Sequence, residues 1–196
     1  EKLIKISNPL LLETSCLRDN LWKEHLEIVN RNIKAGQTSC YIFEVGNVFY
    51  KNSEFNQEEI LNGAIFGNKK IGKWANTYSD IDLNYYQARG KLEEALSCLN
   101  IKIDDKPTNS IDYLHPGRTA DLFIEGKNAG YFGEINPKLI LEKKVLKKVY
   151  LFRINVTNLL AAGTRKNKWI PIYKQYPVVP KMERDINFIF SKEYLI

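Results

Sequence analysis

The chain has 196 residues, enough for one large domain or for one domain and the beginning of a second. Hydrophobic residues make up 44% and charged residues 27%, a balance that supports a substantial core and excludes a disordered chain. The net charge of +6 is compatible with a position near RNA, but many proteins without a nucleic-acid partner are equally basic.

The first part of the chain is predicted to hold a short strand, a long helix and a strong strand. Residues 2–7 are predicted to form the short strand. Thr14 and Ser15 are expected to cap the helix, because their hydroxyls can accept hydrogen bonds from the free amides at a helix start. Apolar residues recur at helical spacing over about residues 16–34, and this broad apolar face suggests burial on more than one side. The aromatic and β-branched stretch 40–50 predicts a central strand or hairpin arm.

The rest of the chain mixes strands and helices without regular alternation between them. The predicted elements are strands at 60–66 and 149–154, a helix at 85–99, a hairpin of 122–124 and 129–133 around the turn 125–128, a short helix opening at Pro137, and a helical turn at 157–162. The polar and basic residues 163–168 predict a linker, and a new unit is expected near Pro177. The predicted fold class is therefore α+β with mainly antiparallel strands.

Both ends of the chain are predicted to be interrupted strands. Residues 1–6 have neither a starting Met nor the layout of a signal peptide, and residues 187–196 stop where a strand is becoming established. We therefore expect a piece of a longer protein. No hydrophobic run approaches the roughly 20 residues that are needed to span a bilayer.

Cysteines and histidines are few and scattered. Cys16, Cys40 and Cys98 have no paired spacing, which argues against a disulfide framework and a zinc site and favours a reducing compartment. His25 and His115 are the only histidines, so neither a metal site nor histidine-based catalysis is expected.

One stretch has the spelling of a phosphate-binding loop. Residues 67–74, from Gly67 to Trp74, satisfy G-x-x-x-x-G-K and follow a predicted strand. However, Trp74 replaces the Ser or Thr that would hold magnesium, and residues 76–80 lack the helix whose N-terminus should face the phosphates. A plain turn between strands is the favoured interpretation.

Two basic stretches could contact anions. Residues 115–118 offer the imidazole of His115 and the guanidinium of Arg118, but a Pro-Gly turn leading into a strand explains them better. The lysine-rich stretch from Lys143 to Lys148 could contact RNA phosphates, and a solvated basic face beside a buried Val-Leu pair is the favoured alternative.

The remaining candidates are carboxylate pairs and a glycosylation triplet. Asp104 and Asp105, like Glu58 and Glu59, are adjacent in sequence, so their side chains point different ways in a strand or helix and form no acid/base pair. The triplet 155–157 spells an N-glycosylation site, which the cysteine usage disfavours. The residues alone therefore predict no catalytic, cofactor-binding or metal-binding site.

Several segments, read in order, resemble the C-terminal half of the bacterial-type phenylalanyl-tRNA synthetase β-subunit family. They are NPL at 8–10 with LRDNL at 17–21, FEVGNVF at 43–49, YLHPGRTA at 113–120, GYFGEINP at 130–137, and YP at 176–177 with RDI at 184–186. The resemblance implies that residues 1–168 form a non-catalytic copy of the class II aminoacyl-tRNA synthetase module, an antiparallel sheet flanked by helices. It also implies that residues 169–196 form a linker and the first strand of a ferredoxin-like anticodon-binding domain.

The resemblance also indicates where an active module would keep its arginines. Formation of an aminoacyl adenylate concentrates negative charge on ATP phosphates, so active relatives aim arginines at them. One such arginine ends a strand reading Gly-x-Val-Phe-Arg, where this chain has Tyr50, and a phenol supplies neither the charge nor the bidentate fork. A second opens a helix after a Gly-rich strand end. The corresponding residues 152–159 contain no glycine and place Asn158 or Leu159 near the arginine position.

Other expectations follow from the resemblance alone. The family works as an α2β2 phenylalanine–tRNA ligase, so the expected partners are the catalytic α subunit and, for the whole enzyme, tRNA(Phe). ATP and magnesium are used by the whole enzyme, and no cofactor or metal is assigned to this part of it. The predicted helix at 16–34 is the candidate contact with the α subunit. A cytoplasmic location is expected, with a plastid or another organelle of bacterial ancestry as the alternative, and no membrane contact.

Two other functions remain as alternatives. A self-sufficient ATP-using ligase would catalyse phenylalanine-dependent pyrophosphate exchange by itself. A stand-alone RNA-binding module would use the mildly basic surface, with the lysines from Lys143 to Lys148 at its centre.

Overall fold

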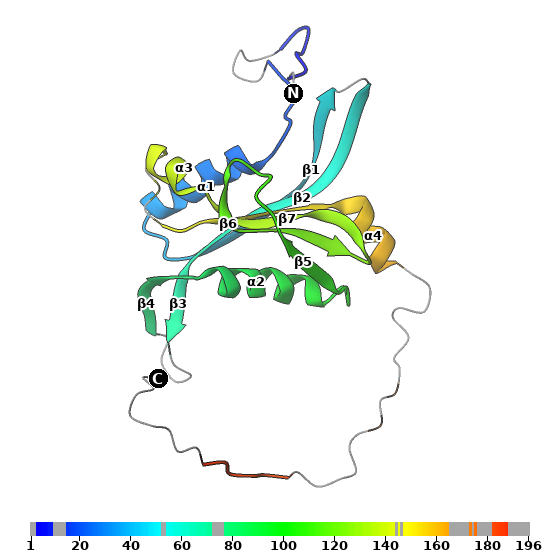
Figure 1. Cartoon of the computed structure of the whole chain (residues 1–196). Helices are drawn as coiled ribbons and strands as arrows, with labels where there is room; N and C mark the ends of the chain where they lie inside the picture. Colours follow the sequence, from blue (N-terminus) through cyan, green and yellow to red (C-terminus); the bar gives the residue numbers. More distant parts are fainter. Residues whose placement is uncertain are drawn as a thin grey trace.

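A six-stranded antiparallel sheet forms the centre of the molecule, with the strand order β1-β2-β8-β7-β6-β5 (Figure 1). The computed structural model describes residues 3–9, 15–51, 54–71, 77–143, 145, 147–164, 173, 175 and 182–187. The strands of this sheet are β1 (Cys40–Lys51), β2 (Phe55–Phe66), β5 (Ile103–Pro107), β6 (Leu114–Ile124), β7 (Lys127–Ile135) and β8 (Tyr150–Asn155). A separate two-stranded ribbon consists of β3 (Asn68–Ile71) and β4 (Thr77–Asp82). The predicted mixed fold with antiparallel strands is confirmed.

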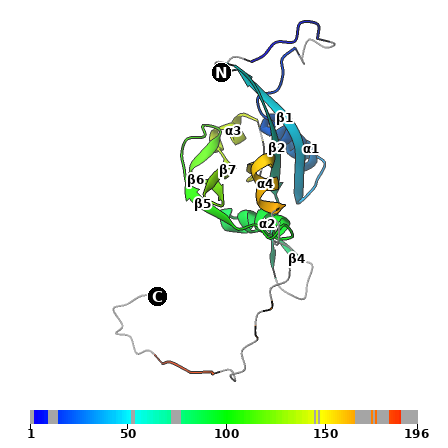
Figure 2. The same ribbon diagram turned by 90° about the vertical axis from the view of Figure 1, so that its right-hand side faces the viewer.

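Helices cover both faces of the sheet. The helices are α1 (Trp22–Lys34), α2 (Tyr85–Ser97), α3 (Pro137–Glu142) and α4 (Val156–Gly163). Leu26 and Val29 of α1 pack with Leu151 of β8 in one core cluster, and this side of the sheet is called the α1 face. Residues of α2 and α4 pack with Phe132 and Phe152 in a second cluster on the other side, called the α2 face. Figure 2 separates α1 and α4 on the two sides of β2.

The hairpin of β1 and β2 is the longest regular feature of the sheet. Its register runs from Cys40 opposite Phe66 to Lys51 opposite Phe55, so β2 is longer than the predicted strand at 60–66. The polar start of β2 does not alternate in hydrophobicity, but pairing with the outer end of β1 keeps it extended. β2 also pairs with β8, whereas β1 forms one edge of the sheet.

The start of α1 differs from the prediction. The helix begins at Trp22, with Leu21 as an N-cap that provides no side-chain hydrogen bond, rather than at residue 16 behind a Ser15 cap. Residues 15–17 instead pair with the N-terminal segment, because the Leu17 amide donates to the Ile4 carbonyl at 2.8 Å and Cys16 forms a bridge with Lys5. Among the described residues 3–7, the predicted strand at 2–7 is reduced to this one bridge. Thr14, the other predicted cap, lies outside the described residues.

Local sequence signals correctly placed several other elements. Asn84 caps α2 in a capping box with Gln87, at 2.9 and 3.0 Å, which fixes the helix start that was predicted at 85. Pro137 opens α3 behind the Asn136 cap, as predicted. β6 and β7 form the predicted hairpin, but its turn is only two residues long, because Gly126 and the residue before it both adopt positive φ.

The predicted linker and domain boundary fall largely outside the described residues. α4 includes Gly163, the first residue of the predicted linker, and ends there. Residues 165–168 and Pro177 are not described, so the division into residues 1–168 and 169–196 stays a prediction. In the described part of the chain, no helix is long and apolar enough to cross a membrane.

Candidate functional site

A polar pocket of about 340 Å³ lies on the α1 face, where β8 runs into α4. It contains the start of α4, the region in which the resemblance locates the second arginine of active relatives. Its lining comes from β2, β6, β7, β8, α4 and the segment before β6: Glu58, Ser110, Ile111, Asp121, Asn128, Ala129, Gly130, Tyr131, Arg153, Asn155 and Asn158. The charged groups in this lining are two carboxylates and one guanidinium.

The guanidinium of the pocket is already neutralised within the chain. Arg153 Nη2 donates to Glu58 Oε2 at 2.6 Å, and both side chains are largely buried. The Asn155 amide donates to the other carboxylate oxygen, Oε1, at 2.8 Å. Since both oxygens of Glu58 are engaged and Asp121 adds a second negative charge, the pocket repels rather than attracts a polyphosphate.

The start of α4 satisfies its own polar groups. The Asn155 side chain accepts from the Asn158 amide at 2.8 Å and thereby caps the helix. The Asn158 side chain in turn donates to the Asn128 carbonyl at 3.0 Å, and Leu159 packs against the core of the α2 face. The neutral helix start predicted from the sequence is therefore present, with its side chains committed to internal contacts.

An aromatic cluster lies between the pocket and α1. The rings of Trp22 and Tyr113 stack with centroids 4.5 Å apart, and Tyr113 makes an edge contact and a hydroxyl hydrogen bond with Tyr131. Burial raises the pKa of Tyr131 above its ordinary value, while Tyr113 and Arg153 act in the opposite direction. Burial likewise raises the pKa of Tyr113. Two half-buried phenols and an indole thus occupy the sheet face beside the pocket.

Tyr50 is the residue at the other position where the resemblance leads us to expect an arginine in active relatives. It lies near the outer end of β1, opposite Asn56 in the hairpin, and is half-buried. Asn158 lines the polar pocket, whereas Tyr50 lies outside its lining. Neither position supplies a positive charge.

The described part of the stretch 67–74, residues 67–71, does not form a phosphate loop. Asn68–Ile71 form β3, which pairs with β4. This part of the stretch is therefore an extended strand, and not a loop whose backbone amides could surround phosphates. The following described element, Thr77–Asp82, is a strand and not the required helix. The favoured interpretation of a plain turn between strands does not hold for residues 68–71, which are themselves a strand, and the following residues 72–76 lie outside the described part of the chain.

Residues 115–118, the first basic stretch considered as an anion site, lie within strand β6. Arg118 Nη1 donates to both carboxylate oxygens of buried Glu134, at 3.1 and 2.9 Å. The Gly117 amide donates to His115 Nδ1 at 3.0 Å, where the pairing with β7 shifts register between Leu114 and Thr119. The predicted turn is therefore a shift of register within strand β6. The guanidinium of Arg118 is paired with Glu134 and is not free for a ligand.

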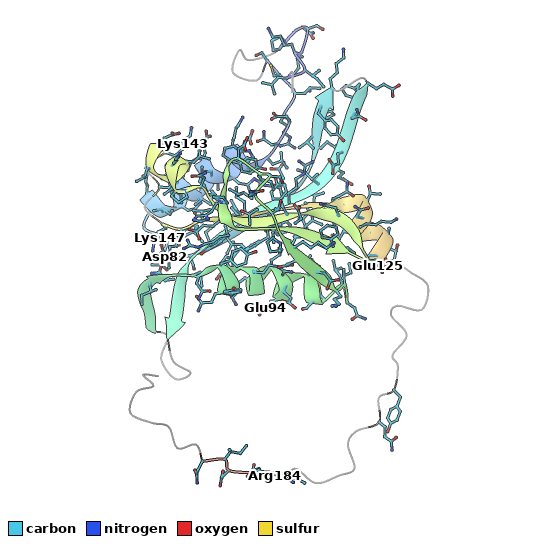
Figure 3. All side chains as sticks on the ribbon, in the orientation of Figure 1. Asp82, Glu94, Glu125, Lys143, Lys147 and Arg184 are labelled. Carbon is cyan, nitrogen blue, oxygen red and sulfur yellow. The ribbon has the colours of Figure 1, made fainter. Side chains whose placement is uncertain are left out.

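The lysine-rich stretch also makes internal contacts. Lys147 Nζ lies 2.6 Å from Asn68 Oδ1 and 3.5 Å from Asp82 Oδ1. The labels of Lys147 and Asp82 are adjacent in Figure 3. The Lys148 amide donates to the other oxygen of Asp82 at 3.0 Å. Val145 is buried as predicted, whereas its neighbours at 144 and 146 lie outside the described residues. These contacts weaken the case for an RNA-binding stretch.

The adjacent acids have separate partners. Asp105 binds Arg89 at 2.7 Å and Asp104 binds Lys102 at 3.0 Å, while Glu58 binds Arg153 and Glu59 is exposed. Neither pair acts as a unit, as predicted.

The apolar residues of α1 are used within the chain. His25, Leu26 and Val29 are buried against the sheet, and Leu17 and Leu21 precede the helix instead of extending its apolar face. Ile28, 40% exposed, is the large apolar residue of α1 that remains open. The prediction of a helix apolar on more than one side is therefore wrong, and α1 offers little apolar surface to a partner.

Comparisons with known proteins place the chain in a family. Residues 1–156 match the model described as "Phenylalanyl tRNA synthetase beta chain CLM domain". A phenylalanine–tRNA ligase β subunit from Prochlorococcus marinus (strain MIT 9312) is 81% identical over 196 residues, which are all of this chain and 24% of that protein. The β subunit from Synechococcus sp. (strain CC9902) is 43% identical over 190 residues, 96% of this chain and again 24% of the relative.

A solved structure with low sequence identity shares the fold. Pyrrolysyl-tRNA synthetase from Desulfitobacterium hafniense superimposes with a TM-score of 0.51 and 15% identity, covering 74% of this chain and 49% of that chain. The present chain spans about a quarter of the length of its β-subunit relatives. On the family model and these relatives, the chain belongs to the phenylalanyl-tRNA synthetase β-chain CLM-domain family.

Proposed function

We propose that the chain is a non-catalytic, class II-like scaffold of phenylalanine–tRNA ligase that associates with the catalytic α subunit. The observation that carries the proposal is the charge of the polar pocket: its one guanidinium is bound to Glu58, and Asp121 adds a second carboxylate to the lining. Catalysis of adenylate formation needs positive charge directed at the phosphates. A pocket with this lining cannot supply it.

The fold supports the class II part of the proposal. The β1–β2 hairpin and β8 are neighbouring strands of one antiparallel sheet with helices on both faces, and the fold is similar to that of a solved aminoacyl-tRNA synthetase. In the proposed enzyme, an α2β2 assembly, the α subunit uses ATP and magnesium to charge tRNA(Phe) in the cytoplasm. Retention of the fold without the arginines is what a structural role requires.

Pyrophosphate exchange tests the catalytic half of the proposal. The chain alone, shown to be folded by circular dichroism, is expected to give no phenylalanine-dependent exchange, whereas the complete α2β2 enzyme should exchange under the same conditions. Exchange by the chain above the level of a heat-denatured sample would contradict the proposal.

Co-expression tests the scaffolding half. The α subunit is expected to co-purify with a β subunit of the relatives' length and to lose this association when residues 1–164 are deleted from it. An α subunit that binds the deleted and intact β subunits equally would contradict a scaffolding role for this domain.

A further inference from the structure

An apolar groove of about 590 Å³ runs along the α2 face between β1 and α2. Its floor is the ring of Phe152, which lies across Gly63 so closely that a β-carbon there would come within 2.5 Å of the ring. Leu92 and Leu96 of α2 form one wall, and Tyr41 and Phe43 of β1 form the other. The groove is therefore a continuation of the core that remains open on one side.

The wall on β1 exposes an unusual amount of apolar surface. Tyr41, Phe43 and Val45 alternate along the strand, point to the same face and are 54%, 73% and 51% exposed. β1 is also an edge strand, and a long edge strand with exposed apolar side chains favours aggregation. Single exposed apolar residues are common, but three in a row beside an apolar groove indicate a covered surface.

The layer of helices on the α2 face is incomplete at this position. α2 covers the part of the sheet that contains Phe132, Tyr150 and Phe152, and its Lys91 and Glu94 form an ion pair at 2.9 Å along the rim of the groove. Beyond α2, no described helix covers the face of β1. One more helix beside α2, apolar toward the sheet and polar toward solvent, would complete the layer.

We propose that this groove holds an amphipathic helix of the same β subunit, from the part of the polypeptide outside residues 1–196. The relatives supply the length: 76% of each lies beyond the matched segment, since this chain covers 24%. A helix in the same polypeptide is present at high effective concentration and needs no separate partner to cover the surface. The inference is independent of pairing with the α subunit, because the groove would be filled before assembly.

Site-specific photocrosslinking identifies the occupant. p-Benzoylphenylalanine replaces Phe43 in a β subunit of the relatives' full length that carries this chain's residues, expressed without the α subunit. Irradiation and peptide mass spectrometry are expected to find a crosslink to one segment of the same polypeptide outside residues 1–196. The same photoreactive residue at Leu141, exposed on α3 of the opposite face, is the control and should not reach that segment.

Other crosslinks would overturn the proposal. A crosslink at position 43 only to the α subunit, after co-expression, would make the groove a subunit interface and leave the proposed scaffold function intact. A crosslink to a second β subunit, or a yield no higher than at position 141, would show that no helix of the same polypeptide fills it.

A substitution provides a second, independent readout. Phe43→Asp is expected to lower the melting temperature of the full-length β subunit clearly and to leave that of residues 1–196 nearly unchanged, because Phe43 is 73% exposed in the latter. Leu141→Asp is the matched control in both proteins. Equal effects of Phe43→Asp on the long and the short protein would contradict a covering helix.

Discussion

The ion pair between Arg118 and Glu134 supplies a buried carboxylate with its cation. Glu134 is 3% exposed, while half-exposed Arg118 keeps part of its hydration. Arg118→Ala leaves a buried carboxylate without its cation, so we expect a loss of about 2–3 kcal/mol in urea unfolding, below the value for a fully buried pair because water reaches the arginine side. Lys102→Ala removes an exposed pair with Asp104 and should cost less than about 0.5 kcal/mol. Similar losses in the two variants would contradict this account.

Buried Tyr150 makes the fold sensitive to alkali. Burial, assisted by the Glu134 carboxylate, raises the pKa of Tyr150 above its ordinary value, and its hydroxyl donates to the Leu83 carbonyl at 2.8 Å. Above about pH 10 the unfolded chain loses this proton while the folded chain keeps it, so stability falls as pH rises, by about 1.4 kcal/mol per pH unit for each such tyrosine. Tyr150→Phe should make the slope shallower above pH 10 and cost about 1 kcal/mol at neutral pH. An unchanged slope would show that Tyr150 does not titrate differently on unfolding.

Replacing glycine by alanine is expected to have opposite effects on stability at two positions, one in a strand and one in a helix. Gly130 in β7 has a φ of +150°, and a β-carbon there would lie 1.8 Å from the Arg153 carbonyl oxygen, so Gly130→Ala must separate β7 from β8. Gly90 is in the interior of α2 with open space around it, so Gly90→Ala should stabilise the chain by about 1 kcal/mol. Thermal unfolding compares them directly. A stable Gly130→Ala variant would contradict the close approach of the two strands.

The elements that could be predicted carry their signals locally. The capping box at Asn84, Pro137 at a helix start and the β-branched run of β1 each act within a few residues. β3 and β5 were not predicted, because edge and ribbon strands carry charged residues and lack apolar alternation, so their extended form depends on a partner strand. The start of α1 was misplaced for the same reason, since Cys16 is held by a bridge to Lys5 that its helical spacing does not reveal.

The sequence allowed us to predict which charged groups the candidate site lacks. It did not allow us to predict which residues pair within the site. The neutral residues Tyr50 and Asn158 follow from motif comparison alone, and of the two only Asn158 lines the polar pocket. The pairing of Glu58 with Arg153 was hidden, because the two residues are 95 positions apart and meet only when β2 pairs with β8. The adjacent acids Glu58 and Glu59 gave no indication of which of them forms an ion pair.

The whole enzyme provides the decisive comparison for the polar pocket. Removing both partners together, as Glu58→Ala with Arg153→Ala, avoids leaving a buried unpaired charge, so the double variant should still fold and assemble. Because the pocket supplies no group to the reaction in the proposed scheme, kcat/KM for charging of tRNA(Phe) by the α2β2 enzyme is expected to stay within about twofold. Asp121→Asn, which removes the remaining carboxylate of the lining, should likewise leave kcat/KM nearly unchanged.

A fall in kcat of tenfold or more, with assembly intact by size-exclusion chromatography, would show that this pocket takes part in catalysis. Such a fall would also separate a chemical role from a scaffolding one, because weaker association of the subunits lowers activity only at low enzyme concentration, whereas a lost chemical group lowers it at every concentration.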